Sequence, residues 1–176
     1  MSHNFCIAPM IDVTNRHCRF FFRKFSKYAR LYTEMVVADS IIFGNKDFLL
    51  GFDEVEHPVA LQIAGSDPKT LSQAAVIGEQ YGYDEINLNI GCPSKRVQAG
   101  NFGACLMADP KLVSECVESI KEKVKIPVTI KCRIAIDDYN PDEMLTEFVE
   151  TTKKTGISTF IIHARKAMLD GLDPKQ

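Results

Sequence analysis

The stretch that decides the fold is Glu85-Ile86-Asn87-Leu88-Asn89-Ile90, in which apolar and amide side chains alternate. Side chains point alternately to the two faces of a β-strand, so this pattern predicts a strand with three apolar residues on one face and two asparagines on the other. A strand covered by helices on both faces would be apolar throughout. The pattern therefore favours a barrel strand with its apolar face against helices and its amides inside.

Neighbouring segments of the sequence repeat this arrangement of polar residues. The residues expected on the inner face, besides Asn87 and Asn89, are Gln62, Thr129, Lys131, Arg133 and His163. Barrel enzymes keep their active sites at the carboxyl ends of the strands. A strand end that simply enters a loop would explain one such residue, but four successive strands with polar ends favour a functional site.

Strand and helix patterns alternate along the whole chain. The predicted strands are Phe5–Pro9, Leu31–Met35, Val59–Ile63, Glu85–Ile90, Val128–Ile134 and Thr159–His163. A capping side chain precedes a proline at three predicted helix starts, Asp67-Pro68, Asp109-Pro110 and Asn140-Pro141. Gly82 and Gly156 are expected to end helices in the left-handed conformation. Six βα units predict a parallel α/β sheet, either doubly wound or the N-terminal six units of a TIM (β/α)8 barrel, and the strand patterns favour the barrel.

The length of the chain bears on the completeness of that barrel. A whole barrel takes about 250 residues, whereas this sequence has 176 and finishes with Gly171–Gln176, a segment typical of a loop. We therefore expect one partial barrel domain over residues 1–176, truncated before its last strands.

The composition is that of an ordinary globular protein. Apolar residues make up 45% and charged residues 25%, and the net charge of −2 gives no hint of a nucleic-acid partner. No apolar run is long enough for a membrane helix, and the N-terminus lacks a signal-peptide pattern. Six scattered cysteines without a C-x-x-C pair favour reduced thiols, mostly in the core, over disulfides or zinc ligands. We expect a cytoplasmic protein without a metal site.

A basic segment runs from Asn15 to Arg30 without an acidic residue. Its cations recur at helical spacing, and Phe21, Phe25 and Tyr28 mark an apolar face. The residues of the basic stripe are Arg16, Arg19, Arg23, Lys27 and Arg30. Two interpretations remain open, a solvated helix face or a patch that contacts RNA phosphates.

A long connection, Gly91–Asp109, follows the strand that ends at Ile90. Structureless loops of more than about 12–15 residues are usually functional. Cys92 stands at its start. A cysteine taken alone is more often a buried structural thiol, but the polar strand ends beside this one favour a catalytic role.

The segment Leu88–Val97 and its continuation Gly103–Met107 closely resemble the signature of the tRNA-dihydrouridine synthases, and in particular the bacterial 20/20a subfamily. Further segments match that family in order and spacing over essentially the whole chain: Ala8–Met10, Tyr32–Met35, Ala60–Gln62, Ile130–Lys131 and Ile161–Lys166. The resemblance implies an FMN-dependent oxidoreductase that reduces uridine to dihydrouridine in the tRNA D-loop, with NADPH as the reductant. It also implies hydride transfer from the flavin to carbon 6 of the uracil and a proton from Cys92 to carbon 5.

The resemblance assigns further residues to roles. It implies that FMN is held by Pro9, Met10, Gln62, Lys131 and His163, with the lysine stabilising the negative charge of reduced flavin. It implies that tRNA is contacted by Asn89, Lys95, Arg96, Arg165 and Lys175. The last strands, with their phosphate-binding loops, and a C-terminal helical tRNA-binding domain would be absent from this sequence. The complete protein is expected to be a monomer.

Two alternatives remain beside the tRNA enzyme. One is a flavin barrel that acts on a free pyrimidine, like the dihydroorotate and dihydropyrimidine dehydrogenases, which also combine an asparagine-rich strand end with Cys-Pro. The other is an inactive fragment of the tRNA enzyme. Nothing in the sequence resembles a dinucleotide-binding motif, so NADPH rests on the resemblance alone.

Overall fold

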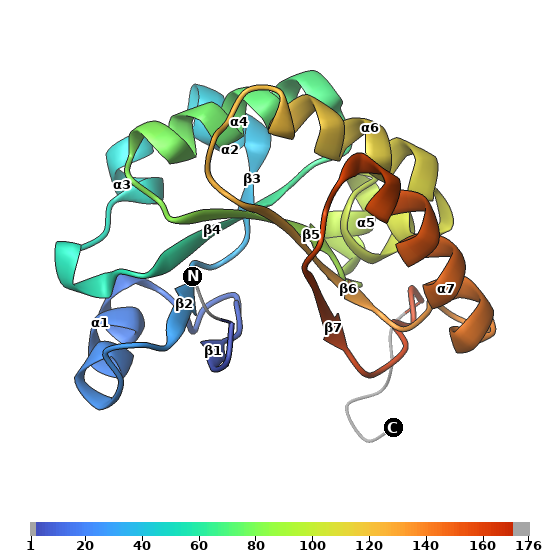
Figure 1. Cartoon of the computed structure of the whole chain (residues 1–176), viewed down its shortest axis with the longest axis horizontal. Helices are drawn as coiled ribbons and strands as arrows, with labels where there is room; N and C mark the ends of the chain where they lie inside the picture. The colour runs from blue at the N-terminus through green and yellow to red at the C-terminus, as the bar shows by residue number, and fades with distance from the viewer. Residues whose placement is uncertain (1–2, 171–176) are drawn as a thin grey trace.

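The strands form one parallel sheet whose order follows the chain. The computed structural model describes residues 3–170, and Figure 1 shows the sheet as an arc with helices on its convex side. The strands in spatial order are β1 (Cys6–Ile7), β2 (Arg30–Tyr32), β4 (Val59–Ala64), β5 (Glu85–Ile90), β6 (Val128–Arg133) and β7 (Phe160–His163), and β3 (Val36–Val37) pairs with the end of β4. A doubly wound sheet would reverse its strand order, so this topology confirms the predicted barrel type.

Three of the helices, α4 (Pro68–Gln80), α6 (Pro110–Lys121) and α7 (Pro141–Thr152), begin where the sequence predicts. Further helices are α1 (Arg16–Phe25), α2 (Ala38–Phe43), α3 (Lys46–Leu50) and α5 (Lys95–Ala99), with short 3-10 turns η1 (Glu54–Glu56), η2 (Gly103–Ala108) and η3 (Lys153–Thr155). Side chains of Asp67, Asp109 and Asn140 accept hydrogen bonds from the first turns of α4, α6 and α7. Gly82 and Gly156 have φ angles of 91° and 80°, which confirms the predicted left-handed positions.

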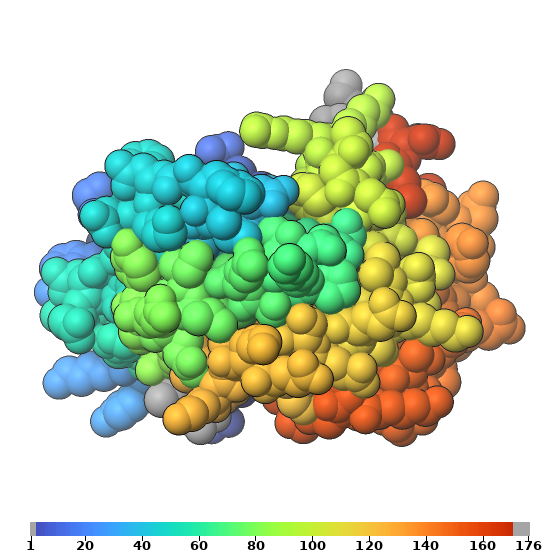
Figure 2. Space-filling model, turned by 90° about the horizontal axis from the view of Figure 1, so that it is seen from above, coloured from blue at the N-terminus to red at the C-terminus, as the bar shows by residue number. Residues whose placement is uncertain are grey.

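The apolar core lies between the sheet and the outer helices. Ile86, Leu88 and Ile90 of β5 are buried there with residues of α4 and α6. These two helices pack against each other, and Figure 2 shows them side by side on the outer surface. The apolar face of β5 therefore points toward the helices, as its alternation predicts.

The opposite face of the sheet is polar, also as predicted. Glu85 is fully buried at the amino end of β5, where it accepts hydrogen bonds from the hydroxyls of Tyr32 at 3.0 Å and Thr129 at 2.6 Å. The guanidinium of Arg30 lies 3.2 Å from the same carboxylate. Burial, and then the charge of Glu85, raise the pKa of Tyr32. This network holds the strands together from the concave side.

The structure contradicts both interpretations for three of the five residues of the basic stripe, whereas Arg16 and Lys27 are exposed. Arg19 is only 4% exposed, and its guanidinium donates to the Glu56 carboxylate at 2.6 Å and to the carbonyl of Thr14. Arg23 is also buried and donates to the backbone carbonyl of Glu56 at 2.7 Å. Arg30 belongs to β2 rather than to the helix. These three arginines are buried structural residues, so they form neither a solvated face nor a phosphate patch.

The predicted apolar face of this segment is exposed instead. Phe21, Phe25 and Tyr28 are 57%, 74% and 88% exposed. Phe21 and Phe25 contact each other edge to face, with ring centroids 4.9 Å apart. The helix is turned with its charged side inward because Glu56 and several carbonyls, distant in sequence, offer buried partners for its arginines.

Two further expectations can be compared with the structure. All six cysteines are free thiols as predicted, but only Cys116 and Cys132 are fully buried, so the core role expected for most of them is wrong. In residues 3–170, no helix combines the length and apolar character needed to cross a membrane. The terminal segment Gly171–Gln176 lies outside the described residues.

Candidate functional site

Cys92 lies at the carboxyl end of β5, and Asn89 fixes its backbone. The side-chain oxygen of Asn89 accepts hydrogen bonds from the backbone N–H groups of Gly91 at 3.1 Å and Cys92 at 3.0 Å. The carbonyl of Cys92 accepts from the N–H of Ala104 at 2.9 Å. Its half-buried thiol lies 3.7 Å from the hydroxyl of Ser94. Both backbone polar groups of Cys92 are thus paired, while its thiol is held only loosely.

The connection after β5 is not the structureless loop that was predicted. It contains α5, which Ser94 caps by accepting from the N–H of Val97, and then η2. Gly103 has a φ of 76°, and a Cβ at this position would lie 2.6 Å from the Cys92 carbonyl. Only glycine permits this close return of the chain. The connection is therefore a folded support for Cys92.

Gln62 is joined to Asn89 in a chain of amides across β4, β5 and β6. The Gln62 oxygen accepts from Asn89 Nδ2 at 2.8 Å, and Gln62 Nε2 donates to Asn87 Oδ1 at 2.7 Å. Asn87 in turn donates to the hydroxyl of Thr129 at 2.8 Å. All four residues are buried. Gln62 retains one N–H for a ligand, and its orientation is fixed by these bonds.

Three cationic side chains and one histidine lie toward the carboxyl ends of β6 and β7: Lys131, Arg133, Arg165 and His163. Asn89 is the register partner of Lys131, and Arg133 is that of His163, so these side chains share the concave face. Arg165 follows β7, and the Arg133 Nε donates to the carbonyl of Gly91 at 3.0 Å. Within residues 3–170, none of these four residues, which we call the cationic cluster, forms an ion pair with a carboxylate.

The pKa values reflect this concentration of positive charge. Burial, followed by Arg133, lowers the pKa of Lys131. Burial, followed by Arg165, lowers the pKa of Arg133. The pKa of His163 is lowered by burial and then by Arg133, Lys131 and Arg165. Uncompensated cations that depress one another's pKa form a site suited to an anionic ligand.

The other predicted site residues occupy the rim of this region or lie elsewhere. Pro9 and Met10 follow β1, and the backbone N–H of Met10 is already donated to Thr14 at 3.0 Å. Lys95 and Arg96 are exposed on α5, and Arg165 is exposed after β7. Lys175 lies outside the described residues. In the part of the chain that the structure describes, no group of three His, Cys, Asp or Glu side chains could hold a metal ion.

Cys105 is the competing thiol of the same connection. Its Sγ donates to the carbonyl of Phe102 at 3.2 Å, and burial raises its pKa. It is therefore less available than Cys92 for chemistry.

Sequence reasoning gave no role to three residues of the site, although it placed Arg133 and Thr129 on the inner face. Arg133 holds the Gly91 carbonyl. Ser94 both caps α5 and approaches the Cys92 thiol. Thr129 ends the chain of amides. The alternation of β6 indicated the positions of Arg133 and Thr129, whereas the position of Ser94 depends on the turn that follows Cys92.

Comparisons with known proteins give a consistent result. The sequence model of the family described as dihydrouridine synthase matches residues 6–173. The chain is 56% identical over 171 residues to a curated protein of Vibrio parahaemolyticus, covering 97% of this chain and 52% of that protein. A protein of Escherichia coli is 54% identical over 176 residues, covering 99% of this chain and 53% of the relative. Both relatives are named tRNA-dihydrouridine(20/20a) synthase, and the chain spans about half of their length.

Proposed function

The chain belongs to the dihydrouridine synthase family, and from this premise we propose that it is the flavin-binding N-terminal part of a tRNA-dihydrouridine synthase. Its reaction would be the reduction of uridine to dihydrouridine in the tRNA D-loop, at the positions 20 and 20a that the names of its relatives give. The observation that carries this proposal is the pairing of Cys92, through Asn89, with Gln62 on the same concave face as the cationic cluster.

The residues on this face fit FMN. The cationic cluster has no carboxylate partner within residues 3–170, and a flavin provides negative charge in its phosphate and in its reduced ring. Gln62 offers its remaining N–H from a fixed position on β4, and Lys131 and His163 lie beyond β5 on the adjacent strands β6 and β7. Pro9 and Met10 remain candidates through their side chains or the Pro9 carbonyl. When bound, FMN would supply the hydride.

Cys92 would supply the proton. A thiol held beside the reacting ring can donate a proton to the carbon that gains negative charge, and such general acid catalysis contributes about 10²–10⁴-fold. Asn89 keeps the backbone of Cys92 in place, and its second Nδ2 hydrogen can reach a uracil carbonyl.

The tRNA would reach this site through the exposed cations around it. Lys95 and Arg96 on α5, and Arg165 after β7, are exposed and would contact phosphates. A D-loop uridine is unpaired, so its base can turn out of the stack at low cost. Lys175 as an RNA contact, NADPH as the reductant and a monomeric enzyme complete the proposal, supported by the family resemblance alone.

The proposal is tested by measuring FMN binding, and activity on tRNA and on free pyrimidines, with the protein at its natural length. We expect FMN absorbance, and dihydrouridine formation from tRNA that lacks it when NADPH is supplied. Turnover of dihydroorotate or a free pyrimidine, without turnover of tRNA, would contradict the proposal. Because the chain spans about half of its relatives, we expect residues 1–176 alone to bind FMN weakly and to leave tRNA unmodified.

Lys131→Met tests the cofactor assignment. Loss of the cation should weaken FMN binding and lower the flavin midpoint potential, since reduced flavin would lose a positive neighbour. Lys111→Met, on the exposed surface of α6, is the matched control and should change neither quantity. An unchanged affinity and potential in Lys131→Met would show that Lys131 does not contact the flavin.

A further inference from the structure

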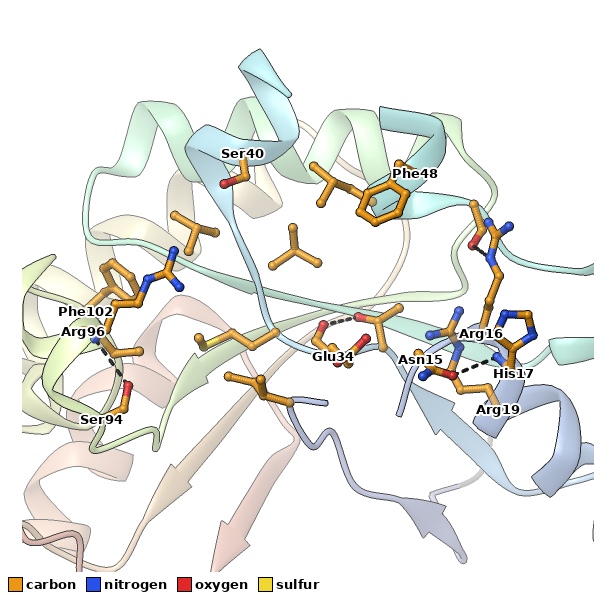
Figure 3. A pocket seen from close by; sticks show the side chains of 18 residues that line it. Asn15, Arg16, His17, Arg19, Glu34, Ser40, Phe48, Ser94, Arg96 and Phe102 are labelled. Carbon is orange, nitrogen blue, oxygen red and sulfur yellow. Dashed lines mark hydrogen bonds between the residues drawn. The ribbon is translucent and has the colours of Figure 1, made fainter. Parts of the chain in front are cut away.

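A cleft of about 910 Å³ opens beside the Cys92 connection, separate from the residues assigned to FMN. Its walls come from the segment after β1, the start of α1, the segment after β2 with β3, and parts of α2, α3 and α5, as Figure 3 shows. Gln62, Lys131 and His163 do not line it, whereas Ser94 does. Sites of this volume hold small organic ligands or single nucleotides. The cleft thus has room for a ligand other than the flavin.

Ser94 connects the cleft to the reacting thiol. Its hydroxyl lies 3.7 Å from Cys92 Sγ, and the same residue forms part of the cleft wall. When a uridine of an RNA strand reaches Cys92, the nucleotide next to it in the strand therefore comes close to the mouth of the cleft. The position of the cleft therefore favours the nucleotide next to the target uridine as its ligand.

The charge of the cleft favours a phosphate. Arg16 and Arg96 are exposed at opposite ends of it, and Arg16 is held in place by donating to the carbonyl of Gly51 at 3.1 Å. Among the lining residues, the one carboxylate is Glu34, which accepts from the N–H of Asp12 at 2.7 Å and contributes one negative charge against the two arginines. Arg19 also lines the cleft, but its charge is paired with Glu56. The remaining charge is positive and accessible.

Phe48 provides an aromatic surface in the same wall. Its side chain is 83% exposed although it lines a cleft, so it contributes little to the packing of the core. The Asn45 side chain caps α3 by accepting from the N–H of Phe48 at 3.1 Å, which fixes the backbone that carries the ring. An ordered, exposed phenylalanine beside free cations is typical of sites that stack an unpaired base.

We propose that this cleft binds the unpaired nucleotide adjoining the target uridine, with its base stacked on Phe48 and the phosphates on its two sides contacted by Arg96 and Arg16, one at each end of the cleft. This inference rests on the proposed function, because it requires an RNA substrate at Cys92. The cleft adds affinity for the strand on one side of the reacting base. It takes no part in hydride or proton transfer.

The test compares Phe48→Ala with Phe43→Ala. Both phenylalanines are 83% exposed, but Phe43, on α2, does not line the cleft, so it is a matched control. In the protein at its natural length, Phe48→Ala should raise KM for tRNA and the Kd of the tRNA complex about tenfold, the usual loss of one stacked base. The kcat and the rate of flavin reduction by NADPH should stay within twofold of wild type. Phe48→Tyr and Phe43→Ala should both keep the wild-type KM for tRNA.

Photocrosslinking identifies the contact directly. A tRNA with 4-thiouridine next to the target uridine should crosslink to the peptide that contains Phe48, and Arg96→Ala should reduce the yield. Equal KM values for Phe48→Ala and Phe43→Ala, or a crosslink to another peptide, would overturn the inference. An increase in KM for NADPH instead of tRNA would assign the cleft to the reductant and would also overturn it. A wild-type protein that binds tRNA through Phe48 without forming dihydrouridine would contradict only the proposed function.

Discussion

The side-chain oxygen of Asn89 accepts a hydrogen bond from the backbone N–H of Cys92 at 3.0 Å, while its Nδ2 donates to Gln62 at 2.8 Å. Asn89 therefore joins the proposed proton donor to the proposed flavin contact. The family resemblance implied a tRNA contact for Asn89, and one free Nδ2 hydrogen still permits it. Its bonded atoms, however, position the protein's own groups.

Asn89→Ala should loosen the Cys92 connection. Removing the side chain leaves the N–H groups of Gly91 and Cys92 without their acceptor, which should lower the free energy of unfolding by about 1–3 kcal/mol. Cys92 should react faster with iodoacetamide, and dihydrouridine formation should fall. Asn140→Ala, which removes the cap of α7, should lower stability by about 1 kcal/mol without changing the reactivity of Cys92. Equal alkylation rates in both variants would show that Asn89 does not order the thiol.

Cys92→Ala should retain FMN binding and lose about 10²–10⁴-fold in the rate of dihydrouridine formation, because only the proton donor is removed. Cys105→Ala should keep most of the activity, since its thiol donates to the Phe102 carbonyl and burial raises its pKa. The rate of reduction of the uracil by the flavin is measured as single-turnover oxidation of the reduced flavin by tRNA. The assignment would be wrong if the two variants behaved in the opposite way.

The parts of the fold that depend on local pattern could be predicted from the sequence. The alternation in β5 indicated which face carries Asn87 and Asn89, and the Asp-Pro and Asn-Pro pairs marked helix starts. The orientation of α1 could not be predicted in this way, because it depends on Glu56, 37 positions after Arg19. The sequence placed Lys131, Arg133 and His163 on the inner face, but only the register shows that Arg133 and His163 lie side by side.

The reversed orientation of α1 has a direct consequence for stability. Arg19→Met leaves the buried Glu56 carboxylate without its cation, and breaking a buried pair in this way costs about 3–5 kcal/mol. Phe25→Ser removes a ring that is 74% exposed and should change the free energy of unfolding by less than about 0.5 kcal/mol. It should also reduce self-association, since it removes part of an exposed aromatic surface. Urea denaturation and light scattering test both variants, and a larger loss in Phe25→Ser than in Arg19→Met would contradict this orientation.

The pH dependence of His163 tests the cationic cluster. Burial and three neighbouring cations lower its pKa, so the side chain should be neutral at pH 7 and titrate below the ordinary value of about 6.5. The unfolded chain then binds more protons than the folded protein just below pH 6.5. Because of His163, the free energy of unfolding should therefore decrease as the pH falls through this window. The decrease should level off below the pKa of His163 in the folded protein.

NMR titration of the imidazole measures this pKa directly. Lys131→Met removes one of the neighbouring cations and should move the His163 pKa upward, whereas Lys166→Met should leave it unchanged, because Lys166 donates to the Asp137 carbonyl and is not among the groups that shift His163. FMN should also move the pKa upward, since a bound anion would offset the positive charge of the cluster. This effect should be smaller in Lys131→Met, where the flavin binds more weakly. If neither Lys131→Met nor FMN changed the pKa of His163, the cationic cluster would not act as one anion-binding site.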